Sequence, residues 1–271
     1  MPSPDSPPVI EVAGLIKHYG KVVAVDGISF SVPAGATVAL LGGNGAGKTT
    51  TLSMLLGLLL PTSGSIRVLG EDMLRHRHRV LARMNFSSPY VDLPHRLTVL
   101  ENLTVFAMLY GIPDRRRRIE EVAEDLAITA LMKRKTGGLS AGQKTRVALA
   151  KAMLNKPEVL LLDEPTASLD PDTGDWVRSY LERYRDRERA AILLASHNMA
   201  EVERLCREVL MMRRGRIVDR GAPAELVARY GRSNLEEVFL DIARERRRHL
   251  PEGEELAELQ SPAAGLEEHD P

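Results

Sequence analysis

A glycine-rich segment between residues 40 and 50, LLGGNGAGKTT, fits the spacing G-x-x-x-x-G-K-[ST] with Gly42, Gly47, Lys48 and Thr49. Glycines let the backbone curl until several N–H groups converge on phosphate oxygens. A helix that starts near Lys48 adds the positive end of its dipole, Lys48 would reach the terminal phosphates, and the Thr49 hydroxyl would ligate magnesium. The pattern therefore predicts a phosphate site in preference to a ligand-free turn. Its residues are Gly42, Gly43, Asn44, Gly45, Ala46, Gly47, Lys48, Thr49 and Thr50.

Two acidic residues, Asp163 and Glu164, follow the apolar run VLLL and precede a proline. Carboxylates in such a place often do no more than end a strand and begin a turn. Beside a phosphate site they gain a chemical role. Asp163 would hold magnesium, directly or through water, and Glu164 would polarise a water for attack on the γ-phosphate. His197 also follows an apolar run, and in the same crevice it is a candidate contact to the γ-phosphate.

Three apolar runs must bring these residues together: ATVALL at 36–41, VLLLD at 159–163 and AAILLAS at 190–196. Continuous apolar runs that alternate with helical patterns are typical of parallel strands covered on both faces. Ligands of open α/β sheets collect beyond the carboxyl ends of the strands, where the phosphate segment, the two acids and His197 would all lie. We therefore expect an α/β fold with a mainly parallel sheet.

The other elements are assigned from periodicity and capping signals. VIEV, VVAV and ISFSV near the N-terminus indicate short strands in a small antiparallel patch, and SIRVLG at 65–70 indicates another strand. A hairpin is expected around Arg214-Gly215, followed by two short helices. Further helices are expected at 48–59 before Pro61, from a Thr98–Glu101 capping box through Tyr110, at 115–126 and at 172–187.

The segment LSAGQK allows two interpretations. Ser140 and Gln143 have the spacing of a capping box, in which the serine oxygen accepts a backbone N–H and the glutamine reaches back. An apolar helical pattern follows, so the segment could be an ordinary helix start. The same geometry would also present backbone N–H groups and a hydroxyl outward, as at a second anion site.

Composition narrows the class of protein. The chain has 271 residues, of which 44% are hydrophobic and 27% charged, and 37 basic residues balance 37 acidic ones. No global charge therefore favours nucleic acid, and the single cysteine, Cys206, excludes an internal disulfide framework. The N-terminus lacks a basic and an apolar signal region, and the longest apolar run, at 54–60, is too short to cross a bilayer. We expect neither a signal peptide nor a membrane span.

The motifs together resemble those of a known family. In order, LLGGNGAGKTT, LSAGQ, VLLLDEPT, ASLD and SH resemble the Walker A, signature, Walker B, D-loop and H-loop motifs of ABC (ATP-binding cassette) nucleotide-binding subunits, over about residues 9–242. The resemblance implies a RecA-like P-loop NTPase core with a small antiparallel β subdomain and an inserted α-helical subdomain. It also implies the cofactors ATP and Mg²⁺, with Thr49 and Asp163 on the metal. The catalytic residues it implies are Lys48, Glu164 and His197.

The resemblance also implies a paired arrangement. In this family two cassettes pack head to tail, and the signature of one meets the γ-phosphate held by Walker A of the other. Tyr19, in KHYG, fits the position of an aromatic that stacks on adenine, and a strand-end tyrosine with its hydroxyl in water is the plainer alternative. Asp170, in ASLD, would link the two sites across the interface. The residues implied to act in trans are Ser140, Ala141, Gly142 and Gln143.

Two positions depart from the family's pattern. Ala141 stands where glycine is more usual, which is a mild change of one methyl group. The family's glutamine after the strand that follows Walker A is replaced by Ser87 or Ser88, which are too short to reach as far. This second departure bears on magnesium-linked coupling to a membrane partner and not on nucleotide binding.

The expected function is that of an ATP-binding and ATP-hydrolysing subunit, which dimerises around ATP and powers a separately encoded transmembrane transporter. The segment SNLEEVFLDIAR resembles the end of exporter-type subunits that pair with ABC-2-like permeases. The expected partners are a second cassette, identical or different, and a membrane permease. The expected place is peripheral, on the cytoplasmic face of the membrane.

Two other classes compete with this function. A non-transport ABC ATPase acting on ribosomes or DNA usually has two cassettes or a long coiled coil, and this chain shows neither. The basic runs at 115–118 and 244–249 lack interleaved aromatics, so solvated helix faces are favoured over nucleic acid or anionic lipid. A P-loop kinase would leave LSAGQ and ASLD unexplained. We therefore expect no nucleic-acid partner.

The expected domain boundaries follow from the same patterns. Residues 1–8 are predicted to be a disordered N-terminus, and residues 9–245 form the cassette. The helical subdomain occupies about 89–155 within it. Residues 246–271 are charged, lack periodicity and are predicted to be a disordered tail.

Overall fold

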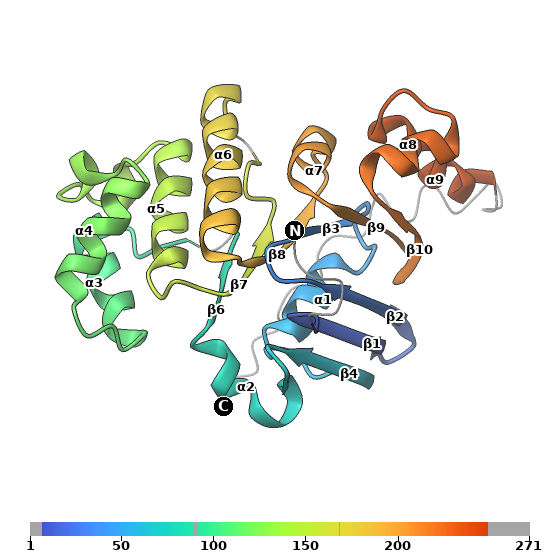
Figure 1. Cartoon of the computed structure of the whole chain (residues 1–271), viewed down its shortest axis with the longest axis horizontal. Helices are drawn as coiled ribbons and strands as arrows, with labels where there is room; N and C mark the ends of the chain where they lie inside the picture. The colour runs from blue at the N-terminus through green and yellow to red at the C-terminus, as the bar shows by residue number, and fades with distance from the viewer. Residues whose placement is uncertain (1–6, 89–91, 168, 249–271) are drawn as a thin grey trace, which may run out of the picture.

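The computed structural model describes residues 7–88, 92–167 and 169–248. Within these residues the chain forms a six-stranded sheet in the order β10-β9-β3-β8-β7-β6 and a four-stranded sheet in the order β2-β1-β4-β5 (Figure 1). Most of the predicted disordered ends, 1–8 and 246–271, lie outside the described residues. The last helix, α9 (Leu235–Arg248), continues three residues past the predicted cassette boundary at 245.

Three neighbouring parallel strands form the middle of the six-stranded sheet: β3 (Thr37–Leu41), β8 (Ala191–Ser196) and β7 (Val159–Asp163). Every residue of these strands is buried, which explains why their sequences are continuous apolar runs. The prediction of buried parallel strands in these segments is confirmed.

The flanking strands complete the sheet. β6 (Met84–Ser87) pairs in parallel with β7, and β9 (Glu208–Arg213) pairs in parallel with β3. β10 (Arg216–Gly221) is antiparallel to β9 and joins it through the predicted hairpin. The mainly parallel α/β fold is therefore confirmed.

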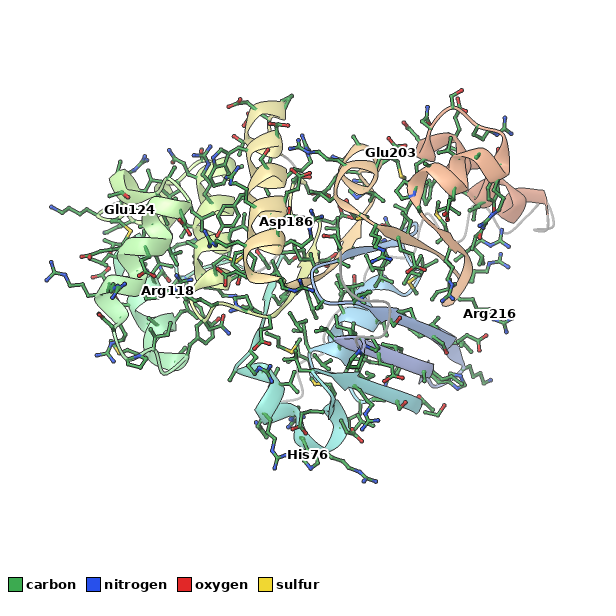
Figure 2. All side chains as sticks on the ribbon, viewed as in Figure 1. His76, Arg118, Glu124, Asp186, Glu203 and Arg216 are labelled. Atoms are coloured by element: carbon green, nitrogen blue, oxygen red, sulfur yellow. The ribbon has the colours of Figure 1, made fainter. Side chains whose placement is uncertain are left out.

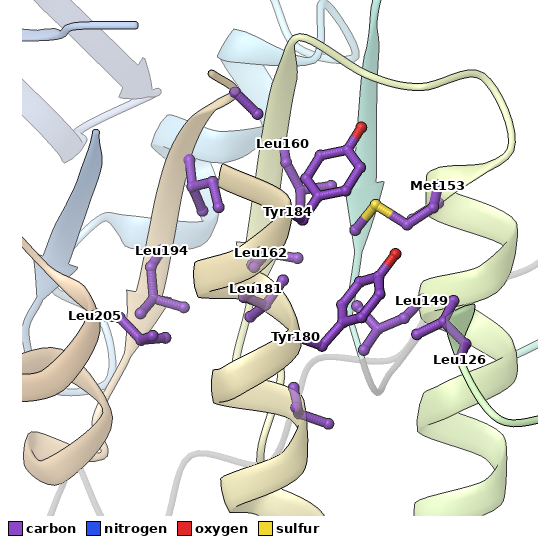
Figure 3. Close-up of a cluster of buried hydrophobic side chains, with 14 of the residues drawn as sticks. Leu126, Leu149, Met153, Leu160, Leu162, Tyr180, Leu181, Tyr184, Leu194 and Leu205 are labelled. Carbon is purple, nitrogen blue, oxygen red and sulfur yellow. The ribbon is translucent and has the colours of Figure 1, made fainter. Parts of the chain in front are cut away.

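Side chains of the central strands alternate between two cores. Leu160 and Leu162 of β7 lie in the core beneath the helices, whereas Val159 and Leu161 lie in the core shared with the antiparallel sheet. Figure 3 shows Tyr180 and Tyr184 of α6 between the sheet and Met153 of α5. The helices on this face include α5 (Ala141–Met153), α6 (Pro171–Glu188) and α7 (Met199–Leu205).

The antiparallel sheet differs from the prediction in its strands. The three short strands expected near the N-terminus are two long ones, β1 (Ile10–Tyr19) and β2 (Val22–Val32), which pair with each other. The expected strands VVAV and ISFSV are joined in β2, where Gly27 has a φ of 69° and the register with β1 shifts between Val25 and Ile28. A bulge of this kind bends a strand without ending it. The sheet is completed by β4 (Ser63–Val68) and β5 (Glu71–Asp72).

The helix after the phosphate segment is shorter than predicted. α1 (Lys48–Leu55) ends before the expected residue 59, and Pro61 is not what stops it. Gly57 adopts a φ of 67°, and its N–H bonds to the Met54 carbonyl while the Leu58 N–H bonds to that of Ser53. These two bonds form a Schellman motif, which satisfies carbonyls at the helix end. The apolar residues after Gly57 therefore lie in a loop.

A group of helices lies at the left of Figure 1 and includes α3 (Val99–Leu109), α4 (Arg115–Asp125) and α5. The Thr98–Glu101 capping box at the start of α3 is confirmed, with bonds of 3.2 and 2.7 Å. The predicted helical subdomain at about 89–155 includes this group, and its boundaries stay a prediction.

The basic run of α4 makes contacts within the chain. Arg116 and Arg117 pair with glutamates one turn later, at 3.0 Å, which fits the prediction of a solvated helix face. Arg118, labelled in Figure 2, donates to the carbonyls of Met153 and Leu154 at the end of α5. One arginine of the run therefore joins α4 to α5.

The remaining elements are short. No helix within the described ranges is both long and apolar enough to cross a bilayer. These elements are α2 (Met73–Leu81), α8 (Pro223–Tyr230) and the 3₁₀ helices η1 (Thr129–Leu131) and η2 (Thr136–Gly138).

Candidate nucleotide site

The carboxyl ends of the three central strands meet at one edge of the sheet. Leu41 pairs with Ser196 and Asp163 pairs with Ala195, so the strands end at the same level. The glycine-rich segment follows β3, Glu164 follows β7 and His197 follows β8. The structure thus gathers the predicted phosphate segment, the two acids and the histidine, as the strand pattern predicted.

The glycine-rich segment turns so tightly that side chains would not fit at two positions. A Cβ on Gly42 would lie 2.6 Å from the Met212 carbonyl oxygen, and one on Gly47 would lie 2.6 Å from that of Ala24. Gly47, at a φ of 103°, is the N-cap of α1 and makes no side-chain cap bond. The first-turn N–H groups of α1 therefore have the orientation and dipole that favour a phosphate anion.

Lys48 arches back over this loop. Its Nζ donates to the carbonyls of Gly42, at 2.6 Å, and Gly43, at 3.3 Å. Burial lowers the pKa of Lys48, and the charges of Glu164 and Asp163 oppose that effect. The ammonium thus lies between the glycine-rich loop and the acids, where it could meet a terminal phosphate. Thr49, by contrast, is exposed at the head of α1.

The two acids after β7 occupy different environments. Burial raises the pKa of Asp163, the neighbouring Glu164 charge adds to the rise, and Lys48 lowers it in part. Glu164 lies in the left-handed region, at a φ of 53°, which costs a non-glycine residue about 1–3 kcal/mol. This turn points the carboxylate at His197, whose Nδ1 is 2.6 Å from Oε1.

The pair of Glu164 and His197 is asymmetric in exposure. The Glu164 side chain is 11% exposed, whereas that of His197 is 69% exposed. When Nδ1 has the proton and donates to Glu164, the opposite ring nitrogen is directed away from the acid. His197 can therefore hold Glu164 on one side and meet a ligand on the other.

Replacing Asp163 with Asn is expected to raise the melting temperature of the nucleotide-free protein at neutral pH. Because the folded-state pKa of Asp163 is raised, its stabilising contribution is present below its unfolded value of 3.8 and is lost as pH rises through the folded value. The ionised carboxylate therefore costs stability at pH 7, and Asn removes that cost. Each kcal/mol gained corresponds to about 2–4 °C at this chain length.

Thermal unfolding of Asp163→Asn and the parent protein at pH 7 and near pH 4 checks this expectation, since the gain should shrink as the pH falls. Added ATP and magnesium should stabilise the parent protein more than the variant, because the variant lacks a carboxylate ligand. A lower melting temperature for the nucleotide-free variant at pH 7 would show instead that Asp163 stabilises the fold.

The LSAGQK segment lies at the start of α5, apart from the glycine-rich loop. The capping box is confirmed: Ser140 Oγ accepts the Gln143 N–H at 3.3 Å, and Gln143 Oε1 accepts the Ser140 N–H at 3.2 Å. A Cβ on Gly142 would lie 3.1 Å from a Thr173 methyl, so the start of α5 lies against the start of α6. Asp170, the N-cap of α6, accepts the Thr173 N–H at 2.9 Å.

Ser140 and Ala141 are exposed at the start of α5. Ser140 and Gln143 bond to each other, Gln143 also accepts from Arg134, and Gly142 lies against Thr173; none of these partners belongs to the glycine-rich loop. One chain therefore brings together the phosphate loop, the acids and the histidine, and it presents the LSAGQK segment on another helix.

Tyr19 ends β1 and is 51% exposed, with the Lys17 ammonium 5.1 Å from its ring centre. It pairs with Val22 at the start of β2, and the Ala24 carbonyl of the same strand lies behind Gly47. Tyr19 thus pairs with β2 two residues before Ala24, the residue that contacts the phosphate loop. Its half-exposed ring could stack on a base.

Ser87 ends β6, one strand outward from β7, and Ser88 follows it. Both serines are buried. Lys151 of α5 donates to the carbonyl of Phe86, immediately before them, at 3.2 Å. The segment that replaces the family's glutamine is therefore packed against the LSAGQK helix.

One buried acid near the crevice was missed by the sequence analysis. Glu201 of α7 bonds to Ser196 and Thr166, which flank His197 and Glu164. Glu201 lies one helical turn before Leu205, on the buried side of α7, and this spacing was the available signal. Periodicity alone does not separate such an acid from an exposed one on so short a helix.

A parallel sheet with a glycine-rich loop after its first buried strand, a helix on that loop and acids after a neighbouring strand defines a P-loop nucleotide-binding protein. A family model described as "ABC transporter" matches residues 25–167. The Nod factor export ATP-binding protein I of Ralstonia nicotianae is 38% identical over 244 residues, which are 89% of this chain and 75% of that protein. The chain belongs to the ABC transporter family, and it is an ATP-binding subunit that hydrolyses ATP.

Solved structures agree with this assignment. The ATP-binding subunit of an ABC transporter superposes with a TM-score of 0.79 at 26% identity, covering 87% of this chain and 99% of that one. The cbiO1 protein from Clostridium perfringens, part of the ABC transporter complex cbiONQ, superposes with a TM-score of 0.75 at 28% identity, covering 93% and 99%. The fold class predicted from the sequence is thus confirmed as that of an ABC ATPase.

Proposed function

We propose that two copies of this cassette, or this cassette and a related one, close head to tail around ATP and drive a separately encoded export permease. The observation that supports this most directly is the separation within one chain of the crevice from the exposed LSAGQK segment. The relatives named as export ATP-binding proteins support the direction. The place proposed is the cytoplasmic face of the membrane, as a peripheral subunit, and the SNLEEVFLDIAR segment favours an ABC-2-like permease.

The crevice residues would divide the work of hydrolysis. The glycine-rich loop and Lys48 would hold the phosphates, and Thr49 and Asp163 would hold magnesium, whose charge, when bound, offsets that on the phosphates. Both fit: Thr49 is exposed at the head of α1, and Asp163 lies within the electrostatic reach of Lys48. Glu164 would accept a proton from the attacking water, and His197 would orient Glu164 while its free edge meets the γ-phosphate.

Affinity purification of the tagged chain from gently solubilised membranes tests the transporter function. We expect a multi-span protein to co-purify in stoichiometric amount and to resist a high-salt wash. The matched control is the same purification from cells with an untagged chain. Recovery of the chain alone, or with ribosomes or DNA, would favour a non-transport ABC ATPase instead.

Tyr19→Ala is expected to weaken ATP binding by about 1–3 kcal/mol, or about 5- to 150-fold, because stacking of a base on an aromatic ring contributes this much. Tyr19→Phe retains the ring and should bind as the parent does. Titration calorimetry with ATP measures both. Equal affinities for the alanine variant and the parent would mean that Tyr19 is an ordinary strand-end residue.

A further inference from the structure

Helix α7 contains a carboxylate that has no role in the function proposed so far. Glu201 is 0% exposed. Burying a charged group is costly unless other groups bond to it. Burial raises the pKa of Glu201, and hydrogen bonds from two hydroxyls lower it. A group buried at such a cost is expected to have a structural or functional consequence.

Each oxygen of the carboxylate is bonded by a different loop of the crevice. The Ser196 hydroxyl donates to Oε2 at 2.7 Å, and the Thr166 hydroxyl donates to Oε1 at 3.0 Å. Ser196 ends β8, and Thr166 lies in the turn after β7. One side chain thus joins the segments that follow two neighbouring strands, and an ionised carboxylate can accept both bonds.

These two loops contain the residues proposed for hydrolysis. His197 immediately follows Ser196, and Glu164 lies two residues before Thr166. The 2.6 Å contact between His197 Nδ1 and Glu164 Oε1 depends on the relative position of the two loops. The bonds of Glu201 to Ser196 and Thr166 connect the two loops and so restrict their relative position.

The bonds around Ser196 also close a ring on the histidine's own loop. Ser196 Oγ accepts the Asn198 N–H at 3.0 Å, and Asn198 Oδ1 accepts the Glu201 N–H at 3.2 Å. The ring passes through the backbone of His197, which lies between Ser196 and Asn198. The backbone on both sides of His197 is therefore held by bonds that connect to Glu201.

We propose that Glu201 is a positioning residue for ATP hydrolysis, which holds Glu164 and His197 in the geometry they need through Thr166 and Ser196. It would touch neither nucleotide nor water. The proposal rests on the roles proposed above for Glu164 and His197.

The test is the steady-state kinetics of Glu201→Gln. The amide keeps the size of the side chain but has one acceptor oxygen where the carboxylate has two, so one of the two loops loses its bond. We expect kcat to fall by about 10- to 100-fold, since small misplacement of catalytic groups has such effects. KM for ATP should stay within about twofold, because no binding group changes.

The matched control is Glu203→Gln on the same helix. Glu203, labelled in Figure 2, is exposed and accepts the Leu235 N–H, which an amide oxygen can also accept. The Glu203→Gln variant should hydrolyse ATP as the parent does. Where Glu201→Gln folds poorly, Thr166→Val removes a single hydroxyl of the network, and its kcat should fall with KM unchanged.

A second measurement separates positioning from mere stabilisation of the fold. In the Glu164→Gln background, adding Glu201→Gln should lower the residual single-turnover rate by a smaller factor than in the parent, because the part of its effect that acts through Glu164 is already lost and only the part through His197 is left. An equal loss in both backgrounds, or a parental kcat for Glu201→Gln, would overturn the proposal. If Glu164→Gln itself hydrolyses at the parental rate, the role proposed for Glu164 fails instead, and the two failures are thus distinct.

Discussion

Glu164→Gln is expected to reduce ATP hydrolysis by about 10²–10⁴-fold while ATP binding stays intact. Glutamine cannot accept a proton from water at this position. Its amide oxygen can still accept the bond from His197 Nδ1, which the carboxylate accepts at 2.6 Å in the parent. The geometry of the crevice should therefore survive while its chemistry is lost.

The fold of this variant should also be unaffected. The left-handed backbone at position 164, with a φ of 53°, costs the same conformational free energy whether the side chain is an acid or an amide. Hydrolysis is what would reopen the proposed pair of cassettes. Without it, a closed dimer should accumulate when ATP is added. Size-exclusion chromatography with and without ATP measures this, alongside the release of phosphate.

The matched control for Glu164→Gln is Glu120→Gln, an exposed acid on α4 that pairs with Arg116. It should hydrolyse ATP as the parent does and should not shift the monomer–dimer equilibrium. A Glu164 variant that hydrolyses at the parental rate would show that another group, or water alone, accepts the proton.

Sequence patterns predicted the centre of this protein better than its margins. The three central strands are buried on both faces, so their residues other than Thr37, Asp163 and Ser196 at the ends are apolar, and the runs could be recognised without knowledge of neighbours. The capping boxes at Thr98 and Ser140 were equally accessible, because each is completed within four residues. Local, redundant signals of this kind predict elements well.

The errors occurred where glycine conformation decided the outcome. Gly27 bends β2 at a bulge without ending it, whereas Gly57 ends α1, and sequence alone does not separate the two cases. For Gly27 the outcome depends on pairing with β1, whereas for Gly57 it depends on N–H groups that close onto carbonyls of the preceding helical turn. Glu201 escaped prediction for a related reason, since its two hydroxyl partners come from separate loops.

Ala141→Glu is expected to abolish hydrolysis almost completely without harming the folded monomer. Ala141 is exposed in the first turn of α5, where an acidic side chain interacts favourably with the helix dipole by about 0.3–1 kcal/mol. In a head-to-tail pair, the same carboxylate would face the γ-phosphate bound by the partner and would repel it. Monomer stability and ATP affinity should therefore be retained, and phosphate release should be lost.

The matched control is Ala224→Glu. Ala224 is also an exposed alanine in the first turn of a helix, α8, which lies at the far end of the molecule from α5 in Figure 1. This variant makes the same charge change in the first turn of another helix and should hydrolyse ATP as the parent does. A loss of activity in both variants would point to net charge and not to the LSAGQK segment.

Combining the two inactive chains distinguishes action in trans from action in cis. Chains with Glu164→Gln and chains with Ala141→Glu can be co-expressed with different tags and purified as mixed dimers. In a trans arrangement each site consists of the crevice of one chain and the LSAGQK segment of the other. One site then has both defects and the other has none. A trans arrangement therefore predicts recovery of about half the parental rate per dimer. If the signature instead served its own crevice, neither chain would contain an intact site, and the mixed dimer would stay as inactive as its parents. The rate of the mixed dimer thus decides whether the crevice of one chain works with the LSAGQK segment of a second.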